Sequence, residues 1–155
     1  MINYFIAHSA SDYANAKVLF EEYATAINID LCFQKFDDEL SSLEQMYHQP
    51  MGGIILAEEE GYFIGCVGVR RIDATTGELK RMYVKPGNQQ KGIGKNLLHQ
   101  AIELAKNCNY TQLKLDTLSS MESAIRLYKA NGFYEIAPYY TNPIATAFYF
   151  EKGLQ

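Results

Sequence analysis

The sequence predicts one mixed α/β domain that spans residues 1–155. In the middle of the chain, three strand-like segments follow one another across short turns, as in an antiparallel meander. Helix-like and strand-like segments then alternate, which predicts one β-α-β crossover between parallel neighbouring strands. With 48% hydrophobic residues, the chain can bury a core without disulfides or metals. We therefore expect a central, mostly antiparallel sheet of about six to seven strands, flanked by about four helices.

The N-terminal third of the chain combines one strand with helices. Ile2 to Ala7 has the pattern of a strand, and Ser9 followed by Asp12 is typical of a helix cap. Apolar residues recur at helical spacing from Ala16 to Ile27, and a second helix is predicted from Phe36 to Tyr47. The domain therefore begins with a strand and two helices.

The rest of the chain supplies most of the sheet. The predicted strands are Gly53 to Glu58, Tyr62 to Arg71, Glu78 to Lys85, Thr111 to Thr117 and Ala145 to Lys152, and the predicted helices are Gly92 to Asn107 and Ser120 to Ala130. Asn131-Gly132 ends the last helix. We find no repeat and no Pro/Gly-rich linker, so nothing divides the chain into two domains.

The charge pattern and the cysteines exclude several functions. The formal net charge is −4 and both signs are interspersed, which disfavours nucleic acid or an anionic membrane surface as the partner. Cys32, Cys66 and Cys108 are widely spaced without a CxxC pair, so we expect buried thiols in a reducing compartment and no metal site. No apolar run reaches about 18 residues, and the chain opens without a signal-peptide pattern. These features predict a cytoplasmic protein without a membrane span.

A glycine-containing loop follows the strand that begins at Glu78. Gly92-Ile93-Gly94 opens the next helix, and a helix N-terminus of this kind binds anions through its unpaired backbone N–H groups and its dipole. The dinucleotide fingerprint would need a third glycine where Leu97 stands. A P-loop would need glycine in place of Gln89, and Ser or Thr in place of Asn96. The loop therefore predicts a phosphorylated ligand of a different kind.

Two motifs resemble the GCN5-related N-acetyltransferase family. Gln89-Gln90-Lys91-Gly92-Ile93-Gly94 is similar to its Gln/Arg-x-x-Gly-x-Gly/Ala pyrophosphate signature, and Leu79 to Pro86 looks like the strand that precedes it. Ala124, Leu127-Tyr128 and Gly132-Phe133 resemble the family's Ala-x-x-Leu-Tyr-x-x-x-Gly-Phe segment. The predicted order of elements is also the family's order. One departure is Met121, because many relatives carry an Asn there that contacts the cofactor.

The resemblance implies that acetyl-CoA is a co-substrate, bound largely by backbone groups. The pyrophosphate would lie at Gln89, Gln90, Lys91, Gly92, Ile93, Gly94 and Lys95, and the pantetheine arm along Met82, Tyr83 and Val84. Lys91 and Lys95 could offset phosphate charge. We expect the neighbouring Lys80, Arg81 and Lys85 to be ion pairs and solvated surface.

Two residues are candidates for proton transfer. Tyr128 stands where the family places a phenol near the coenzyme A sulfur, and could protonate the departing thiolate; by spacing alone it could equally be a core tyrosine. Glu78 could accept the proton of the amine if burial raises its pKa toward neutrality. Otherwise it is a solvated carboxylate at a strand start. Asp116, on the neighbouring strand, is a weaker candidate for the same role.

The acceptor side is less defined. Asn28 to Asp38 carries exposed apolar residues in a polar setting, including Phe33, and suits a lid over the acceptor. The segment after the last helix walls the acceptor site in relatives, which suggests Tyr139, Tyr140 and Asn142 as acceptor contacts, although tyrosines also cap sheet edges without function. Asp30, Asp37 and Asp38 suggest a cationic or amine acceptor, as a small molecule or a peptide.

Three functions remain open: an acetyltransferase, a non-catalytic acyl-CoA sensor on the same fold, and an assembly subunit. Tyr128 beside an intact Gly92-Ile93-Gly94 loop favours the enzyme, because a sensor needs only the loop. The sequence leaves the oligomeric state open, a homodimer included.

Overall fold

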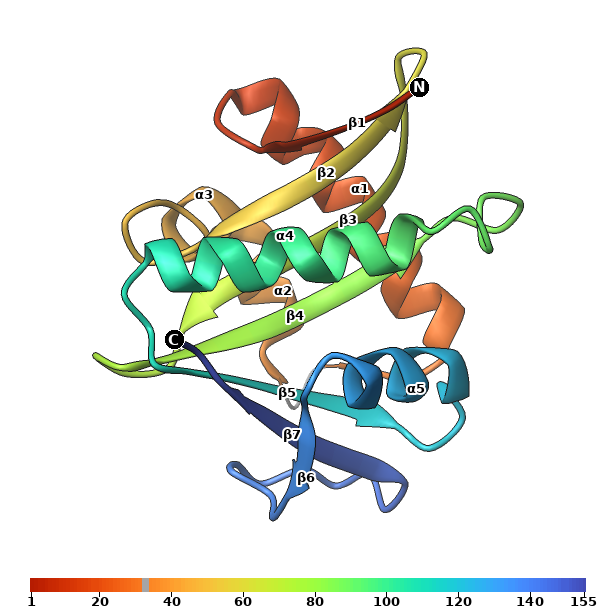
Figure 1. Ribbon diagram of the computed structural model, residues 1–155. Helices are drawn as coiled ribbons and strands as arrows, with labels where there is room; N and C mark the ends of the chain where they lie inside the picture. The colour runs from red at the N-terminus through yellow and green to blue at the C-terminus, as the bar shows by residue number, and fades with distance from the viewer. Residues whose placement is uncertain (32–33) are drawn as a thin grey trace.

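The computed structural model describes residues 1–31 and 34–155. Within them the chain forms strands and helices in the order β1 (Ile2–Ile6), α1 (Ala10–Ile27), α2 (Phe36–Ser41), α3 (Leu43–Met46), β2 (Gly53–Glu59), β3 (Tyr62–Arg71), β4 (Thr76–Val84), α4 (Ile93–Asn107), β5 (Gln112–Leu118), α5 (Glu122–Ala130), β6 (Tyr134–Ile136) and β7 (Ala147–Gly153). Figure 1 shows them as one twisted sheet with helices packed against it. In the described part of the chain, no helix is both long and apolar enough to cross a membrane.

The strands form one seven-stranded sheet in the order β1-β2-β3-β4-β5-β7-β6. All neighbours are antiparallel except β4 and β5, which α4 connects as the predicted crossover. The predicted fold class, a mixed and mostly antiparallel sheet with one β-α-β unit, is confirmed.

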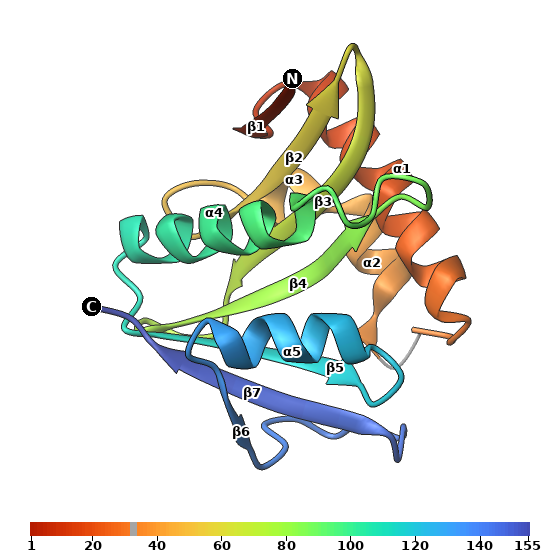
Figure 2. The same ribbon diagram turned by 45° about the vertical axis from the view of Figure 1, so that its right-hand side comes forward.

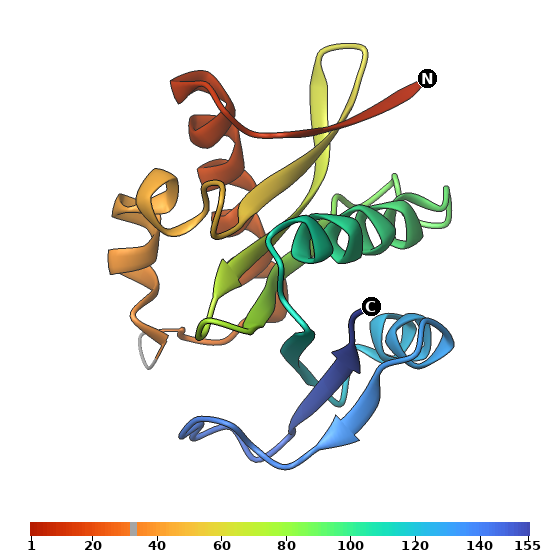
Figure 3. The same ribbon diagram turned by 60° about the vertical axis from the view of Figure 1, so that its left-hand side comes forward.

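Helices cover both faces of the sheet, as Figure 3 shows with α1 to α3 on one side and α4 and α5 on the other. Side chains alternate across a strand, so Ile54 and Leu56 of β2 pack with the α1 side, whereas Ile55 and Ala57 pack with α4. Both faces of β2 are buried, which explains why its apolar residues are nearly continuous.

The sheet opens between β4 and β5. These strands pair only where Thr76–Glu78 meets 112–114, and beyond that point they diverge, as Figures 1 and 2 both show. On its other side, β4 shifts register against β3 between Cys66 and Gly68, and Arg81 has a left-handed φ of 58°. A bulge of this kind bends a strand locally. The opening is therefore built by the ends of β4 and β5, with the bulge at its margin.

Two predicted elements were wrong in detail. The single helix from Phe36 to Tyr47 is two short helices, since Ser42 leaves the helical region with a φ of −133°. Glu39 of α2 and Leu43 of α3 are both buried. Residues Tyr134–Ile136, expected in a loop, form β6 because they pair with β7.

The predicted lid is only partly exposed. Leu31 is buried, at 5% exposure, so this apolar side chain does not stand in solvent as expected. Phe33, proposed as an acceptor contact, and Cys32 lie outside the described residues.

Candidate functional site

The loop before α4 has a backbone suited to an anion. Gly87, Gln90 and Gly92 have left-handed φ values of 88°, 69° and 76°. Gly92 is the N-cap of α4, and no side chain caps the helix there. The first N–H groups of α4 therefore remain for a ligand, at the positive end of a 15-residue helix. This arrangement fits the pyrophosphate of acetyl-CoA.

The side chains of the loop contribute less than its backbone. Ile93 is buried in the core at 1% exposure, so only its backbone can reach a ligand. Gln89 and Gln90 are exposed, as is Lys95 near the start of α4. The Nζ atom of Lys91 lies 3.2 Å from an oxygen of Asn88 and 3.8 Å from Glu59. Gly94 adds no side chain.

Beside the loop, alternate residues of β4 point to opposite faces. Met82 and Val84 pack with the α4 side of the core. Tyr83 points toward α1, where its hydroxyl donates to Glu22 at 3.2 Å. A ligand along this strand would therefore meet the backbone of Tyr83 and not its ring.

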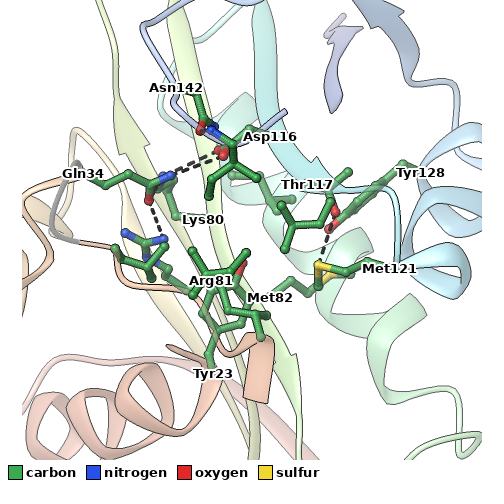
Figure 4. A pocket seen from close by; sticks show the side chains of 16 residues that line it. Tyr23, Gln34, Lys80, Arg81, Met82, Asp116, Thr117, Met121, Tyr128 and Asn142 are labelled. Atoms are coloured by element: carbon green, nitrogen blue, oxygen red, sulfur yellow. Dashed lines mark hydrogen bonds and ion pairs between the residues drawn. The ribbon is translucent and has the colours of Figure 1, made fainter. Parts of the chain in front are cut away.

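A pocket occupies the opening between β4 and β5 (Figure 4). It brings together four of the predicted residues, Met82, Asp116, Tyr128 and Asn142. The other lining residues are Tyr23, Ile27, Ile29, Leu31, Gln34, Leu79, Lys80, Arg81, Thr117, Leu118, Met121 and Ile144. The pocket is thus shared by α1, the segment after it, β4, β5 and α5.

Tyr128 both packs in the hydrophobic core and lines the pocket. Its ring packs against Phe133 and Phe150, with centroids 5.7 and 6.4 Å away, and only 4% of the residue is exposed. It also lines the pocket, next to Met121 and Thr117 in Figure 4. Burial raises the pKa of Tyr128, so the phenol keeps its proton at neutral pH. It is therefore a core residue that presents a protonated hydroxyl group to the pocket region.

Glu78 is not solvated. It is 4% exposed, and its oxygens accept hydrogen bonds from Arg70 Nε at 3.0 Å and Tyr139 Oη at 2.7 Å. Burial acts to raise its pKa, but the charges of Lys80 and Arg70 and the bond from Tyr139 together leave that pKa below its usual value. The expected rise toward neutrality is not found, because cations share its burial. Glu78 is therefore an ionised carboxylate at neutral pH.

A second pocket, of about 480 Å³, is lined in part by Glu78. Tyr139 and Tyr140 line it, whereas Asn142 lines the first pocket. The remaining lining residues are Gln34, Met46, Met51, Arg70, Arg71, Ile72, Glu78 and Lys80. Gln34 and Lys80 line both pockets, so the two are adjacent. Tyr128, Asn142, Glu78, Tyr139 and Tyr140 thus line two adjacent pockets, whereas the predicted loop residues 89–95 line neither.

Gln34 lines both pockets and gave no signal in the sequence. Its Oε1 accepts from Arg81 Nη1 at 2.7 Å and from Lys80 Nζ at 3.2 Å. Its Nε2 donates to Tyr140 at 2.7 Å and to Asp116 at 3.3 Å. The segment after α1 is thereby joined to β4, β5 and the segment before β7.

Lys80 and Arg81 form ion pairs, as one part of the prediction has it, but these ion pairs are buried and not at the surface. Each is 4% exposed. Arg81 binds Glu39, and the Nζ atom of Lys80 lies 3.6 Å from Asp116 and 3.9 Å from Glu78. Burial lowers the pKa of Lys80. Two adjacent cations in a strand with apolar neighbours were the sequence signal for buried ion pairs. Their carboxylate partners are distant in sequence, so spacing along the chain could not identify those partners.

Similar proteins are known. The sequence pattern described as "Acetyltransferase (GNAT) family" matches residues 18–133. An uncharacterised N-acetyltransferase of Schizosaccharomyces pombe is 36% identical over 140 residues, which cover 89% of this chain and 86% of that protein. A GNAT acetyltransferase from Staphylococcus aureus Mu50 superposes with a TM-score of 0.82 at 25% identity, with both chains fully covered.

A GNAT acetyltransferase from Elizabethkingia anophelis, solved with acetyl-CoA bound, superposes with a TM-score of 0.70 at 24% identity and covers 99% of this chain and 98% of its own. At that identity the likeness concerns the fold. The family match over most of the chain and the extended similarity to the yeast protein carry the assignment. The chain belongs to the acetyltransferase (GNAT) family.

Proposed function

We propose that this protein transfers the acetyl group of acetyl-CoA directly to the amine of a small molecule or peptide, with both substrates bound at once. The observation that carries the proposal is the opening between β4 and β5. One pocket lies within it, a second pocket adjoins the first at Gln34 and Lys80, and the loop after β4 leads to the uncapped N-terminus of α4. One pocket would receive the activated acetyl group and the other the acceptor.

The residues of this chain would bind acetyl-CoA mainly through their backbone. The N–H groups of residues 90–95 would hold the pyrophosphate, and the backbone of Met82 to Val84 would hold the pantetheine arm. The E. anophelis relative, solved with acetyl-CoA, supports this choice of co-substrate. When bound, acetyl-CoA supplies the thioester whose acyl group is transferred.

Tyr128 is the proposed proton donor. Its Oη would give a proton to the sulfur that leaves when the new C–N bond forms. The raised pKa of Tyr128 keeps that proton in place until it is needed. Backbone N–H groups near the bulge at Arg81 would stabilise the carbonyl oxygen during attack.

Glu78 is the proposed proton acceptor for the amine nitrogen, with Asp116 as the alternative. Glu78 lines the second pocket and Asp116 lines the first. Because its pKa is lowered, Glu78 is a weak base that is ionised throughout the neutral range. A water molecule between Glu78 and the amine would suit such a base. The acceptor would contact Tyr139, Tyr140 and Asn142, and Phe33 stays a proposed contact.

A reducing compartment such as the cytoplasm fits this proposal, because the described cysteines Cys66 and Cys108 are free thiols. Burial raises the pKa of Cys66, so this thiol is a core residue and not a nucleophile.

The purified protein should release free coenzyme A thiol from acetyl-CoA when a suitable amine is added, and mass spectrometry should find one acetyl group on that amine. The control is the same mixture without protein. If calorimetry shows that acetyl-CoA binds, yet no member of a broad amine, amino-acid and peptide panel is acetylated, the protein is a sensor or an assembly subunit instead.

A further inference from the structure

The second pocket is rich in positive charge. Three cationic residues line it, Arg70, Arg71 and Lys80, against one carboxylate, Glu78. Arg70 and Lys80 are already engaged, because both contact Glu78, and Lys80 also contacts Asp116. Among the described residues, no carboxylate lies within ion-pair distance of Arg71. One cation of this pocket is therefore without a counter-charge.

Apolar side chains also line this pocket. They include Met46 and Met51, from α3 and the segment after it, and Ile72, just after β3. Gln34 and Lys80 line both pockets, so the two pockets meet there. A ligand that fills the second pocket would contact Arg71, these apolar side chains and Lys80, beside the first pocket.

The acidic residues that suggested a cationic acceptor lie elsewhere. Asp37 and Asp38 are exposed on α2. Neither they nor Asp30 are among the described residues that line the two pockets. A simple cationic amine would meet three positive side chains and one carboxylate that two of them already neutralise. The electrostatics of the pocket thus disfavour an acceptor that is only a cation.

We propose that the acceptor carries a carboxylate as well as its amine, as an amino acid does, with the carboxylate bound at Arg71 and the amine toward Glu78, in the same pocket. The inference rests on the proposed acetyl transfer and specifies its acceptor. A guanidinium group suits this role, since it can donate two parallel hydrogen bonds to a carboxylate. Arg71 would select the acceptor without touching the reacting atoms.

The test compares acceptors that differ only in this group. The common L-amino acids are screened as acceptors, and the best is compared with its amide and with the amine that lacks the carboxyl group. We expect kcat/KM for the acid to exceed both by about tenfold or more, as expected for one charge-assisted hydrogen bond. Equal or better use of the amide and the amine would overturn the inference while leaving acetyl transfer intact.

Arg71→Gln separates this role from a structural one. It should raise KM for the acid by about tenfold or more, with little change in kcat and little change for the amide. Arg126→Gln, on the exposed part of α5, is the matched control and should behave as the wild type. An unchanged KM for the acid in Arg71→Gln would overturn the inference.

If no acid, amide or amine is acetylated, the proposed function has failed, and calorimetry still decides the chemistry of the pocket. The amino acids are titrated into the protein with coenzyme A present. Binding that Arg71→Gln weakens would support the carboxylate site. No binding, or binding that the variant leaves unchanged, would overturn it.

Discussion

Arg81 binds the carboxylate of Glu39 with two hydrogen bonds, from Nη2 at 2.8 Å and from Nε at 3.2 Å, and both side chains are at most 2% exposed. The hydroxyl group of Tyr47 donates to the same carboxylate at 2.9 Å. This ion pair joins α2 to the bulge of β4.

Glu39→Gln should therefore destabilise the fold strongly. Removing one partner of a buried ion pair leaves the other charge without compensation, which costs about 3–5 kcal/mol of unfolding free energy. Urea denaturation measures the loss. Asp37→Asn, an exposed position on the same helix, is the control and should change stability by less than about 0.5 kcal/mol. A loss under about 1 kcal/mol in Glu39→Gln would show that the pair is not the main link.

The two buried glutamates predict the response to acid. The pKa values of Glu39 and Glu78 are both lowered, since cations offset their burial. The unfolded chain then binds more protons than the native one, so stability is full above the ordinary glutamate pKa and is lost as pH falls through the lower native values. Urea midpoints between about pH 6 and pH 3 should fall steadily. A flat profile would contradict these shifts.

Gly92→Asp should abolish the binding of coenzyme A. The substitution places a carboxylate at the proposed pyrophosphate site and a side chain at a φ of 76°, which favours glycine. Gly61→Asp is a matched control, because Gly61 also has a left-handed φ, of 85°, and open space around it, but lies in the β2–β3 turn. Calorimetry on both folded variants gives the comparison. Undiminished affinity in Gly92→Asp would remove the loop from the site.

Tyr128→Phe should lower turnover by about ten- to a thousandfold and leave the affinity for acetyl-CoA nearly unchanged, as expected for a lost proton donor. Because the pKa of Tyr128 is raised, its loss should matter equally across neutral pH. Tyr134→Phe, an exposed tyrosine on β6, is the control. Turnover is measured by steady-state kinetics under conditions in which chemistry limits the rate. An unchanged turnover number in Tyr128→Phe would show that Tyr128 has only a structural role.

Glu78→Gln should lower kcat/KM at every pH if Glu78 accepts the proton of the amine. In the unmodified protein, the acidic limb that Glu78 gives to the pH profile of kcat/KM should lie below the usual glutamate pKa and not near neutrality, since the pKa of Glu78 is lowered. Asp116→Asn is the matched variant, because Asp116 also contacts Lys80. Denaturation curves must accompany the kinetics, as both changes remove an ion pair. A parent rate in Glu78→Gln and a slow Asp116→Asn would assign the role to Asp116.

Local patterns were sufficient for much of the fold. The capping box at Ser9 and Asp12 formed as predicted, because both hydrogen bonds lie within one helical turn. The meander and the β4-α4-β5 crossover also followed from alternation and helical spacing, which read neighbours in the sequence. The glycine loop before α4 also followed from consecutive residues, and its helix begins at Gly92 without a side-chain cap; the anion site there stays a prediction.

The character of the site was decided by contacts between distant residues. Lys80 and Arg81 were predicted as ion pairs or solvated surface, but their partners Asp116 and Glu39 lie 36 and 42 positions away, and only the tertiary structure buries these pairs. Burial acts to raise the pKa of Glu78, as considered from the sequence, but the charges of Lys80 and Arg70 buried beside it leave that pKa lowered. Pattern along the chain determined where the elements lie, and only packing between them determined which charges are buried together.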